Sequence, residues 1–207
     1  MKMTILRLLL AAAVLAAVST RAADKAVRYE GQPGGKIKID GTSSVHDWTV
    51  ETQIIGGFLE VDAAFDADFK AFKKPKVEVS IPIRSLKSGK KPMDTVMQET
   101  MKMGEHPKIE YRLIDMSPRP GAEAAKAQFE ARGALTVAGV TRTNTMVVTL
   151  QHVDAKTIKV TGTAAVKMTD HGMKPPAPAL ALGLIKTGDD VKLTIEWLTA
   201  RVEGEKK

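Results

Sequence analysis

Histidine and carboxylate side chains are the groups of this chain best suited to catalysis or metal binding. The stretch "SSVHDWTV", residues 43–50, places His46 directly before Asp47, and Asp170 directly precedes His171. These two pairs would have to meet in space to form a two-histidine, carboxylate metal site or a hydrolase centre. No two of the four histidines have H-x-H or H-x-x-x-H spacing, and the chain has no cysteine to complete a zinc site. A metal site is therefore not predicted.

The segment around His46 has the pattern of a β-strand. Successive strand residues face opposite sides of a sheet, so His46 and Asp47 are not expected to act as one dyad. The hydroxyls of Ser43 and Ser44 are only a weak hint of nucleophilic catalysis. The chain lacks a G-x-S-x-G elbow, a phosphate-binding glycine loop and a dinucleotide fingerprint. The sequence thus favours a protein that is not an enzyme and has no catalytic residues, with His46 at the rim of a β-structure.

Residues 1–22 have the composition of a secretory signal peptide. Lys2 and Arg7 accompany an apolar run of leucine, alanine and valine that ends at Val18, and small residues follow. The 11 apolar residues after Arg7 are few for a membrane-spanning helix, which needs about 20. Cleavage after Ala22 would leave residues 23–207 as one exported domain, periplasmic or secreted.

The remaining chain is long enough for one domain with a sizeable core. Without cysteine it has no disulfides, so its stability must come from the core and the sheet. Removal of Lys2, Arg7 and Arg21 would lower the formal net charge from +7 to +4, and the basic residues are scattered. This pattern indicates a solvated surface with a mild affinity for anionic lipid headgroups. An aromatic content of 4% without a basic stripe argues against nucleic-acid binding.

Period-two alternation of apolar residues dominates the sequence after residue 36. In "KVEVSIPIRSL", Val79, Ile81 and Ile83 share one face of a predicted strand, and Pro82 suggests a strand end, an edge or a bulge. Similar patterns recur in "KIEYRLIDM", "FEARGALTV", "TMVVTLQHV", "TIKVTGTAAVKM" and "DVKLTIEWL", with turn residues between them. Eight or nine strands joined by short turns predict an all-β fold, an antiparallel barrel of about eight strands whose interior can hold one ligand.

One segment departs from this alternation. Residues 92–103, "PMDTVMQETMKM", carry apolar side chains at the spacing of one helix face, with a proline at the first turn and a glycine directly after the last. The sequence therefore predicts one short helix that caps an end of the barrel. Its Val96, Met97 and Met101 either fill gaps in the core or form a pliable lid over an apolar cavity, and the two roles are compatible.

Five stretches of the chain form a recognisable series. The most specific is "GALTVAGVTRTNTMVVTL", residues 133–150, with a glycine, an alternating strand, a "GVT" turn and an apolar return strand. The others are "GGFLEVD", "SIPIRSLKSGKKPMD", "GEHPKIEYRL" and "KMTDHGMK". In this order they resemble the YceI-like family, a lipocalin-like, polyisoprenoid-binding group of bacterial envelope and periplasmic proteins. The resemblance extends from about Lys36 to Val202. It implies a barrel around a long apolar tunnel that holds an isoprenoid, a quinone-like lipid or another amphipathic lipid, with no other cofactor.

The alternating patterns and the resemblance together predict a set of ligand-binding residues. Those expected to line the interior or to close one end are Val79, Ile81, Ile83, Val96, Met97, Met101, Leu113, Leu135, Val148, Ile195 and Trp197. Those expected at a polar mouth beside the headgroup are His46, Trp48, Arg84 and Arg112.

Two alternatives stay open at this point. One is a structural or interaction protein of the envelope whose barrel is filled by its own side chains. The other is a hydrolase that uses His46 and His171. Transient contact with a membrane surface and a homodimer are both compatible with the sequence.

Overall fold

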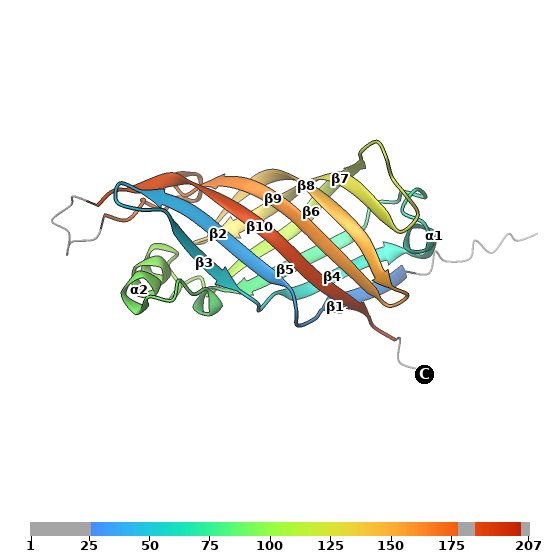
Figure 1. Ribbon diagram of the computed structural model, residues 1–207, viewed down its shortest axis with the longest axis horizontal. Helices are drawn as coiled ribbons and strands as arrows, with labels where there is room; N and C mark the ends of the chain where they lie inside the picture. Colours follow the sequence, from blue (N-terminus) through green and yellow to red (C-terminus); the bar gives the residue numbers. More distant parts are fainter. Residues whose placement is uncertain (1–25, 178–184, 204–207) are drawn as a thin grey trace, which may run out of the picture.

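Extended strands form most of the molecule in the computed structural model, which describes residues 26–177 and 185–203 (Figure 1). The predicted signal peptide, residues 1–22, lies outside the described residues. The strands, in chain order, are β1 (Ala26–Gly31), β2 (Lys36–Ser43), β3 (Trp48–Thr52), β4 (Gly56–Asp62), β5 (Lys76–Pro82), β6 (Lys108–Pro118), β7 (Lys126–Val137), β8 (Val140–Asp154), β9 (Thr157–Lys167) and β10 (Thr187–Arg201). The helical elements are α1 (Ala63–Ala67), α2 (Lys91–Thr100) and the 3-10 turns η1 (Ile83–Ser85) and η2 (Thr169–His171). In the described ranges, no helix is long and apolar enough to cross a membrane.

Antiparallel pairing closes the sheet into a barrel. The ring runs β1, β4, β5, β6, β7, β8, β9, β10, and β10 returns to pair with β1. One edge of β10 pairs with β9, and the other edge is shared by two strands. On that shared edge the C-terminal end of β10 faces β1, as in the pair Tyr29 and Arg201, and the rest faces β2, as in the pair Gly41 and Val191. β2 and β3 thus extend the closed ring as a hairpin. The predicted antiparallel, lipocalin-like barrel of about eight strands is confirmed, with β2 and β3 added to it.

Alternation of side chains decides which residues face the interior. β7 is the clearest case, because buried and exposed residues alternate strictly along its first half. Phe129 and Ala131 are buried and face inward, whereas the charged Glu130 and Arg132 face solvent. The two faces of the strand therefore become an apolar interior and a polar exterior, as the period-two pattern predicts.

An aromatic cluster around α1 closes one end of the barrel. Phe65 on α1 is fully buried and contacts Phe69, Phe72 and Phe129, with ring centroids 5.3–5.7 Å apart. The ring of His152 stacks on Phe69 at 4.6 Å. The expectation of a single short helix was wrong, since α1 is a second one. A helix of five residues makes too few turns to show helical periodicity in the sequence.

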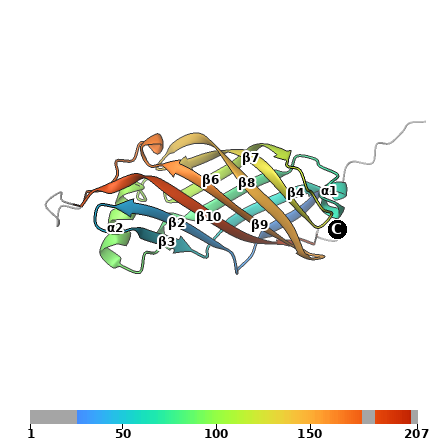
Figure 2. The ribbon, with the colours of Figure 1, turned by 45° about the horizontal axis from the view of Figure 1, so that its top comes forward.

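The opposite end of the barrel carries α2, as Figures 1 and 2 show. Here β3 is the last strand of the sheet, and it meets the chain beyond β5 through a bridge between Glu51 and Lys87. α2 follows this bridge and packs the half-buried Met93 and Met97 against the core. The helix therefore covers the end of the barrel where strand pairing is incomplete.

Candidate functional site

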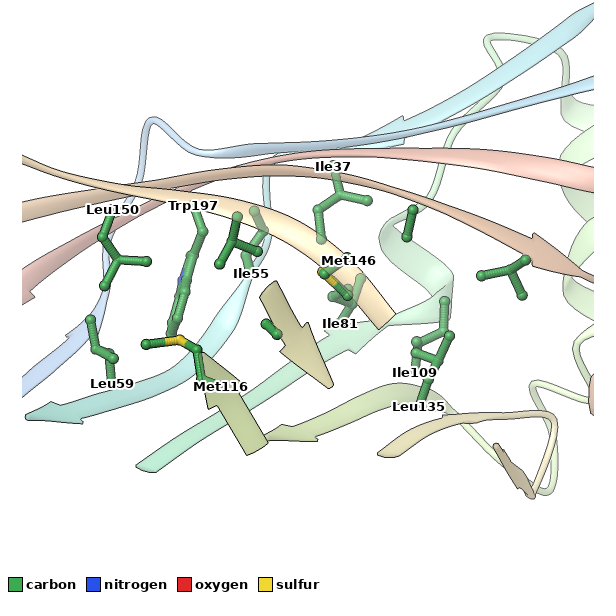
Figure 3. Close-up of a cluster of buried hydrophobic side chains, with 14 of the residues drawn as sticks. Ile37, Ile55, Leu59, Ile81, Ile109, Met116, Leu135, Met146, Leu150 and Trp197 are labelled. Carbon is green, nitrogen blue, oxygen red and sulfur yellow. The ribbon is translucent and has the colours of Figure 1, made fainter. Parts of the chain in front are cut away.

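The barrel encloses a cavity of about 440 Å³. Nine of the ten described strands, together with α2, contribute side chains to its wall. Figure 3 shows part of this wall, where Ile37, Ile81, Leu135 and Met146 come from different strands and lie around a common space. The volume falls within the range of about 300–1,000 Å³ that is usual for ligand pockets. The interior of the barrel is therefore hollow.

Inward-facing residues that keep partial exposure mark the hollow part of the barrel. Leu193 and Ile195 lie in the cavity wall, yet each retains an intermediate accessible surface. Their neighbours Lys192 and Glu196 are exposed on the outer face of β10. The partial exposure of the two apolar residues is thus exposure to the cavity, because the strand turns its polar side to the solvent.

The wall is apolar along most of its length and becomes polar at one end. Polar side chains that border the cavity at the α2 end are Ser43, His46, Lys90, Thr100 and Thr187. Val45 in the same region is 64% exposed, whereas Leu59, deep in the wall, is 2% exposed. The cavity therefore opens beside α2 and the turn between β2 and β3, and the aromatic cluster closes its other end.

Most of the residues predicted to contact a ligand lie in the wall of this cavity. They are Val79, Ile81, Val96, Met97, Met101, Leu113, Leu135, Val148, Ile195 and Trp197, together with His46 and Trp48 from the predicted mouth. Val96 and Met97 lie on α2 and Met101 is its C-cap, so all three belong to the segment predicted as a helix at residues 92–103. The fold thus brings together side chains from six strands that lie far apart in the sequence.

Three of the predicted contact residues, Ile83, Arg84 and Arg112, do not border the cavity, and their predicted placement is corrected. β5 ends at Pro82, and Ile83 and Arg84 enter η1, so the strand alternation on which their placement rested stops there. Ile83 is instead fully buried in the core, and Arg84 is exposed. Arg112 stands between two inward-facing residues of β6, so its side chain faces outward.

Methionines form an unexpected share of the wall. Within the described ranges, seven of the chain's ten methionines border the cavity: Met93, Met97, Met101, Met116, Met146, Met168 and Met173. Strict alternation from Ile109 would instead turn Asp115 inward. A β-bulge between Leu113 and Asp115 shifts the phase by one residue, so that Met116 faces the cavity. The sequence did carry a signal, because an inward aspartate would be a charge buried among apolar groups.

Asp94 anchors the first turn of α2. Its Oδ1 accepts hydrogen bonds from the backbone N–H of Ser88 at 2.7 Å and from the Ser88 hydroxyl at 2.6 Å. Burial alone would raise the pKa of Asp94, but these hydrogen bonds and the charge of Lys87 lower that pKa below its ordinary value. A negative charge also suits the N-terminal turn of a helix. The ionised carboxylate therefore holds the start of α2 to the loop before it.

The turn between β2 and β3 is shaped by contacts of its own side chains. The Ser43 hydroxyl donates to the carbonyl oxygen of His46 at 2.6 Å. The indole N–H of Trp48 donates to the carbonyl oxygen of Thr42 at 3.1 Å, and its ring covers Gly41, where a β-carbon would clash. These contacts hold Trp48 against the hairpin and leave His46 exposed at the mouth.

The two histidines considered for chemistry are engaged separately. Nδ1 of His46 lies 2.8 Å from the carbonyl oxygen of Asp47, and Nδ1 of His171 lies 2.9 Å from that of Val140. His46 is exposed and His171 is buried. In the part of the chain that the structure describes, no group of three or more His, Cys, Asp or Glu side chains is placed to hold a metal ion. This arrangement gives the hydrolase alternative no support.

A closed antiparallel barrel around an apolar cavity that opens beside α2 defines a lipocalin-like β-barrel. The sequence profile of the YceI-like domain matches residues 37–198, and the chain belongs to this family. The resemblance inferred from the sequence is thereby confirmed. A comparison with curated proteins finds no match.

Solved structures share this fold at low sequence identity. BcnA of Burkholderia cenocepacia aligns with a TM-score of 0.64 and 14% identity, over 79% of this chain and 95% of that one. A polyisoprenoid-binding domain from Saccharophagus degradans, implicated in plant cell wall breakdown, gives 0.64 and 12%, over 84% and 98%. The YCEI protein of Campylobacter jejuni gives 0.55 and 20%, over 74% and 84%. These likenesses establish the fold of the barrel.

Proposed function

We propose that this protein is an exported carrier, without enzymatic activity, that holds a polyisoprenoid or a similar amphipathic lipid inside its barrel. The observation that carries the proposal is the hollow, apolar interior of about 440 Å³. A polyisoprenoid-binding domain is among the proteins that share the fold, which supports the same class of ligand. The signal-peptide composition of residues 1–22 supports a periplasmic or secreted location.

Burial of apolar surface is sufficient to hold such a ligand. Each methylene group that leaves water contributes about 0.8 kcal/mol. Ten buried methylene groups would contribute about 8 kcal/mol, which corresponds to micromolar affinity before the cost of ordering the chain is subtracted. Binding of this kind needs no catalytic group and no metal ion. It does need an interior that the protein's own side chains leave open, and this barrel has one.

The shape of the cavity sets the orientation of the bound lipid. Phe65, Phe69 and Phe129 are fully buried at the α1 end, so the apolar tail points toward that end. His46 and Lys90 border the cavity at the other end. The headgroup therefore lies toward α2, because a polar group buried among apolar side chains would lose its hydrogen bonds to water without replacement.

Uptake and release take place at the α2 end, and transient contact of this end with a membrane surface is part of the proposal. The rim offers the exposed side chain of Val45 and the cationic Lys90. An apolar group beside a basic one suits the interface of an anionic bilayer. Binding of the mature protein to vesicles with and without anionic lipid tests this contact, and substitution of Val45 by Ser is expected to weaken it.

Native mass spectrometry of the mature protein, purified from the cells that make it and followed by organic extraction, tests the carrier function. We expect a stoichiometric long-chain isoprenoid or quinone-like lipid. A protein that carries no lipid and takes up no added isoprenoid would contradict the proposal. It would favour instead a structural role in which the barrel binds another envelope protein.

A further inference from the structure

Three buried side-chain atoms have no hydrogen-bond partner among the described residues. They are the hydroxyl oxygen of Tyr111, Oδ1 of Asn144 and Nε1 of Trp197. An unpaired polar group in the interior lowers the stability of the fold, so each such group requires an explanation. Nε1 of Trp197 lies beside Gly31 on β1. The other two atoms belong to a different part of the barrel, on the strands β6 and β8 that pair with the two edges of β7.

Tyr111 and Asn144 are both neighbours of Gly133 on β7. Gly133 faces Asn144 of β8 in register, and facing residues of an antiparallel pair have their β-carbons about 5 Å apart. The Tyr111 ring reaches over from β6 and covers Gly133 so closely that a β-carbon there would overlap the ring and its hydroxyl. The absence of a side chain at Gly133 therefore lets the Tyr111 hydroxyl extend toward the side chain of Asn144.

Both side chains belong to the inner face of the barrel. Tyr111 borders the cavity, and Asn144 precedes the cavity-lining Met146 and Val148 at the same alternation along β8. The Tyr111 ring lies at the cavity wall while its hydroxyl oxygen is covered. A small movement of the ring into the void would bring the hydroxyl to the cavity surface.

Along the barrel axis, Tyr111 and Asn144 lie toward the α2 end. Tyr111 faces Leu135 in register and lies two residues from Ile109 on the same strand. Figure 3 shows Ile109 and Leu135 grouped away from Leu59 and Leu150, which lie deep in the wall. The pair therefore stands just inside the half of the cavity where the proposed orientation places the headgroup.

The chemistry of the two groups is complementary to that of an alcohol. Burial raises the pKa of Tyr111 to about 12, so the hydroxyl stays protonated and can donate. The amide nitrogen of Asn144 donates to the carbonyl oxygen of Ala165 at 3.1 Å, which leaves Oδ1 as an acceptor. A hydroxyl group accepts one hydrogen bond and donates another, whereas an ether or a quinone carbonyl can only accept.

We propose that Tyr111, in the cavity wall, and Asn144, on the same inner face of the barrel, form a polar niche that binds the hydroxyl group of an isoprenoid alcohol. The lipid hydroxyl accepts a hydrogen bond from Tyr111 and donates one to Oδ1 of Asn144. This inference rests on the proposed carrier function and names the headgroup class that the carrier prefers. It assigns a specificity role to two residues that are far apart in the sequence.

Binding of three ligands with the same isoprenoid tail separates the contributions of the two hydrogen bonds and of the apolar tail. The ligands are geranylgeraniol, its methyl ether and the corresponding hydrocarbon. Both tryptophans of the chain border the cavity, so their fluorescence reports binding to the delipidated mature protein. The wild type should bind the alcohol about tenfold more tightly than the ether, as expected for one buried hydrogen bond. Asn144→Leu should remove most of this preference, because the ether lacks only the hydrogen bond that the alcohol donates to Oδ1 of Asn144. Tyr111→Phe should instead weaken binding of the alcohol and of the ether together, relative to the hydrocarbon. Thr145→Val, at the exposed neighbouring position, is the matched control.

The stability of the variant without added lipid provides a second readout. Tyr111→Phe keeps the ring and removes the unpaired hydroxyl, so its thermal midpoint should be higher than that of the wild type. Affinities for the three ligands that keep the same ratios in Tyr111→Phe, with binding intact, would overturn the niche alone. Failure of the wild type to bind any of the three would overturn the carrier function, and the niche with it.

Discussion

The two ends of the barrel are built from different kinds of apolar side chain. The α1 end holds four of the chain's five phenylalanines, packed ring against ring. The α2 end holds Met93 and Met97 on a helix that has no buried residue, and Met101 at the C-cap of that helix. A phenylalanine is rigid and fills a fixed shape, whereas a methionine has three rotatable bonds and adapts to its neighbours. The α1 end is therefore a rigid stopper of packed rings, and the α2 end has a cover whose side chains can adapt.

The difference teaches that apolar character alone does not decide whether a region holds the fold together or serves a ligand. The aromatic cluster contributes no residue to the cavity wall, while α2 contributes several. Substitutions at the two ends should accordingly separate stability from ligand retention. The predictions below test this separation, from the largest expected effect to the smallest.

Truncation at the aromatic end should have the largest effect on stability. Phe65→Ala is expected to lower the free energy of unfolding by about 3–5 kcal/mol, because it leaves a cavity among three other rings. Urea unfolding of the mature protein measures the loss. Phe58→Ala is the matched control, since Phe58 packs under the guanidinium of Arg28 on the outside. Equal losses of unfolding free energy in the two variants would contradict the proposal that the aromatic cluster closes and stabilises the α1 end.

A bulky residue in the cavity should abolish ligand binding with a smaller effect on stability. Ile195→Trp places a large ring in the cavity, whereas Thr194→Trp places the same ring on the outer face of β10. Isoprenoid uptake, followed by native mass spectrometry, should fail only for Ile195→Trp. If both variants took up lipid equally, the binding site would lie outside the barrel.

A polar residue on the inner face of α2 should speed up lipid release. Met97 is half-buried, so Met97→Ser is expected to cost only about 1 kcal/mol of stability while exposing the lipid to water. The dissociation rate of a bound isoprenoid, measured by transfer to acceptor vesicles, should rise. Glu99→Ser on the exposed face of the same helix provides the comparison. Identical rates for the two variants would mean that α2 is not the cover of the cavity.

The smallest effect concerns pH. The pKa of Asp94 is lower in the folded protein than its ordinary value, so its stabilisation is complete above an unfolded pKa of about 3.9. It is lost as the pH falls through the folded value. The protection factors of the α2 amides, which correct for the pH dependence of intrinsic exchange, should therefore fall on acidification below about pH 4, by less than about 1 kcal/mol. Asp94→Asn should flatten this dependence, and an unchanged dependence would place the acid sensitivity elsewhere.

Much of the barrel could be predicted from the sequence because period-two alternation depends only on local geometry. β7 follows the pattern strictly, and ten of the eleven residues predicted to line the interior or close its end border the cavity. The exceptions arise where the backbone leaves regular geometry. Ile83 follows the last residue of β5 and enters η1. Met116 faces inward only because a bulge shifts the phase of β6.

The sequence held no pattern of this kind that indicated the pairing of Tyr111 with Asn144. Tyr111 fitted the alternation of its strand, and Asn144 stood within a stretch identified for its family resemblance. Their proximity depends on the register of three strands and on the missing side chain of Gly133. Pairwise register between distant segments is a tertiary property, and a pattern within one strand does not contain it.

A tube that is stoppered at one end constrains how its contents can travel. Among the described residues, fully buried rings close the α1 end, so a lipid bound as proposed would arrive and leave at the α2 end. A carrier of this kind would hold its lipid and would not pass it straight through from one membrane to another. Such a carrier would present its α2 end first to the donor of the lipid and then to the acceptor.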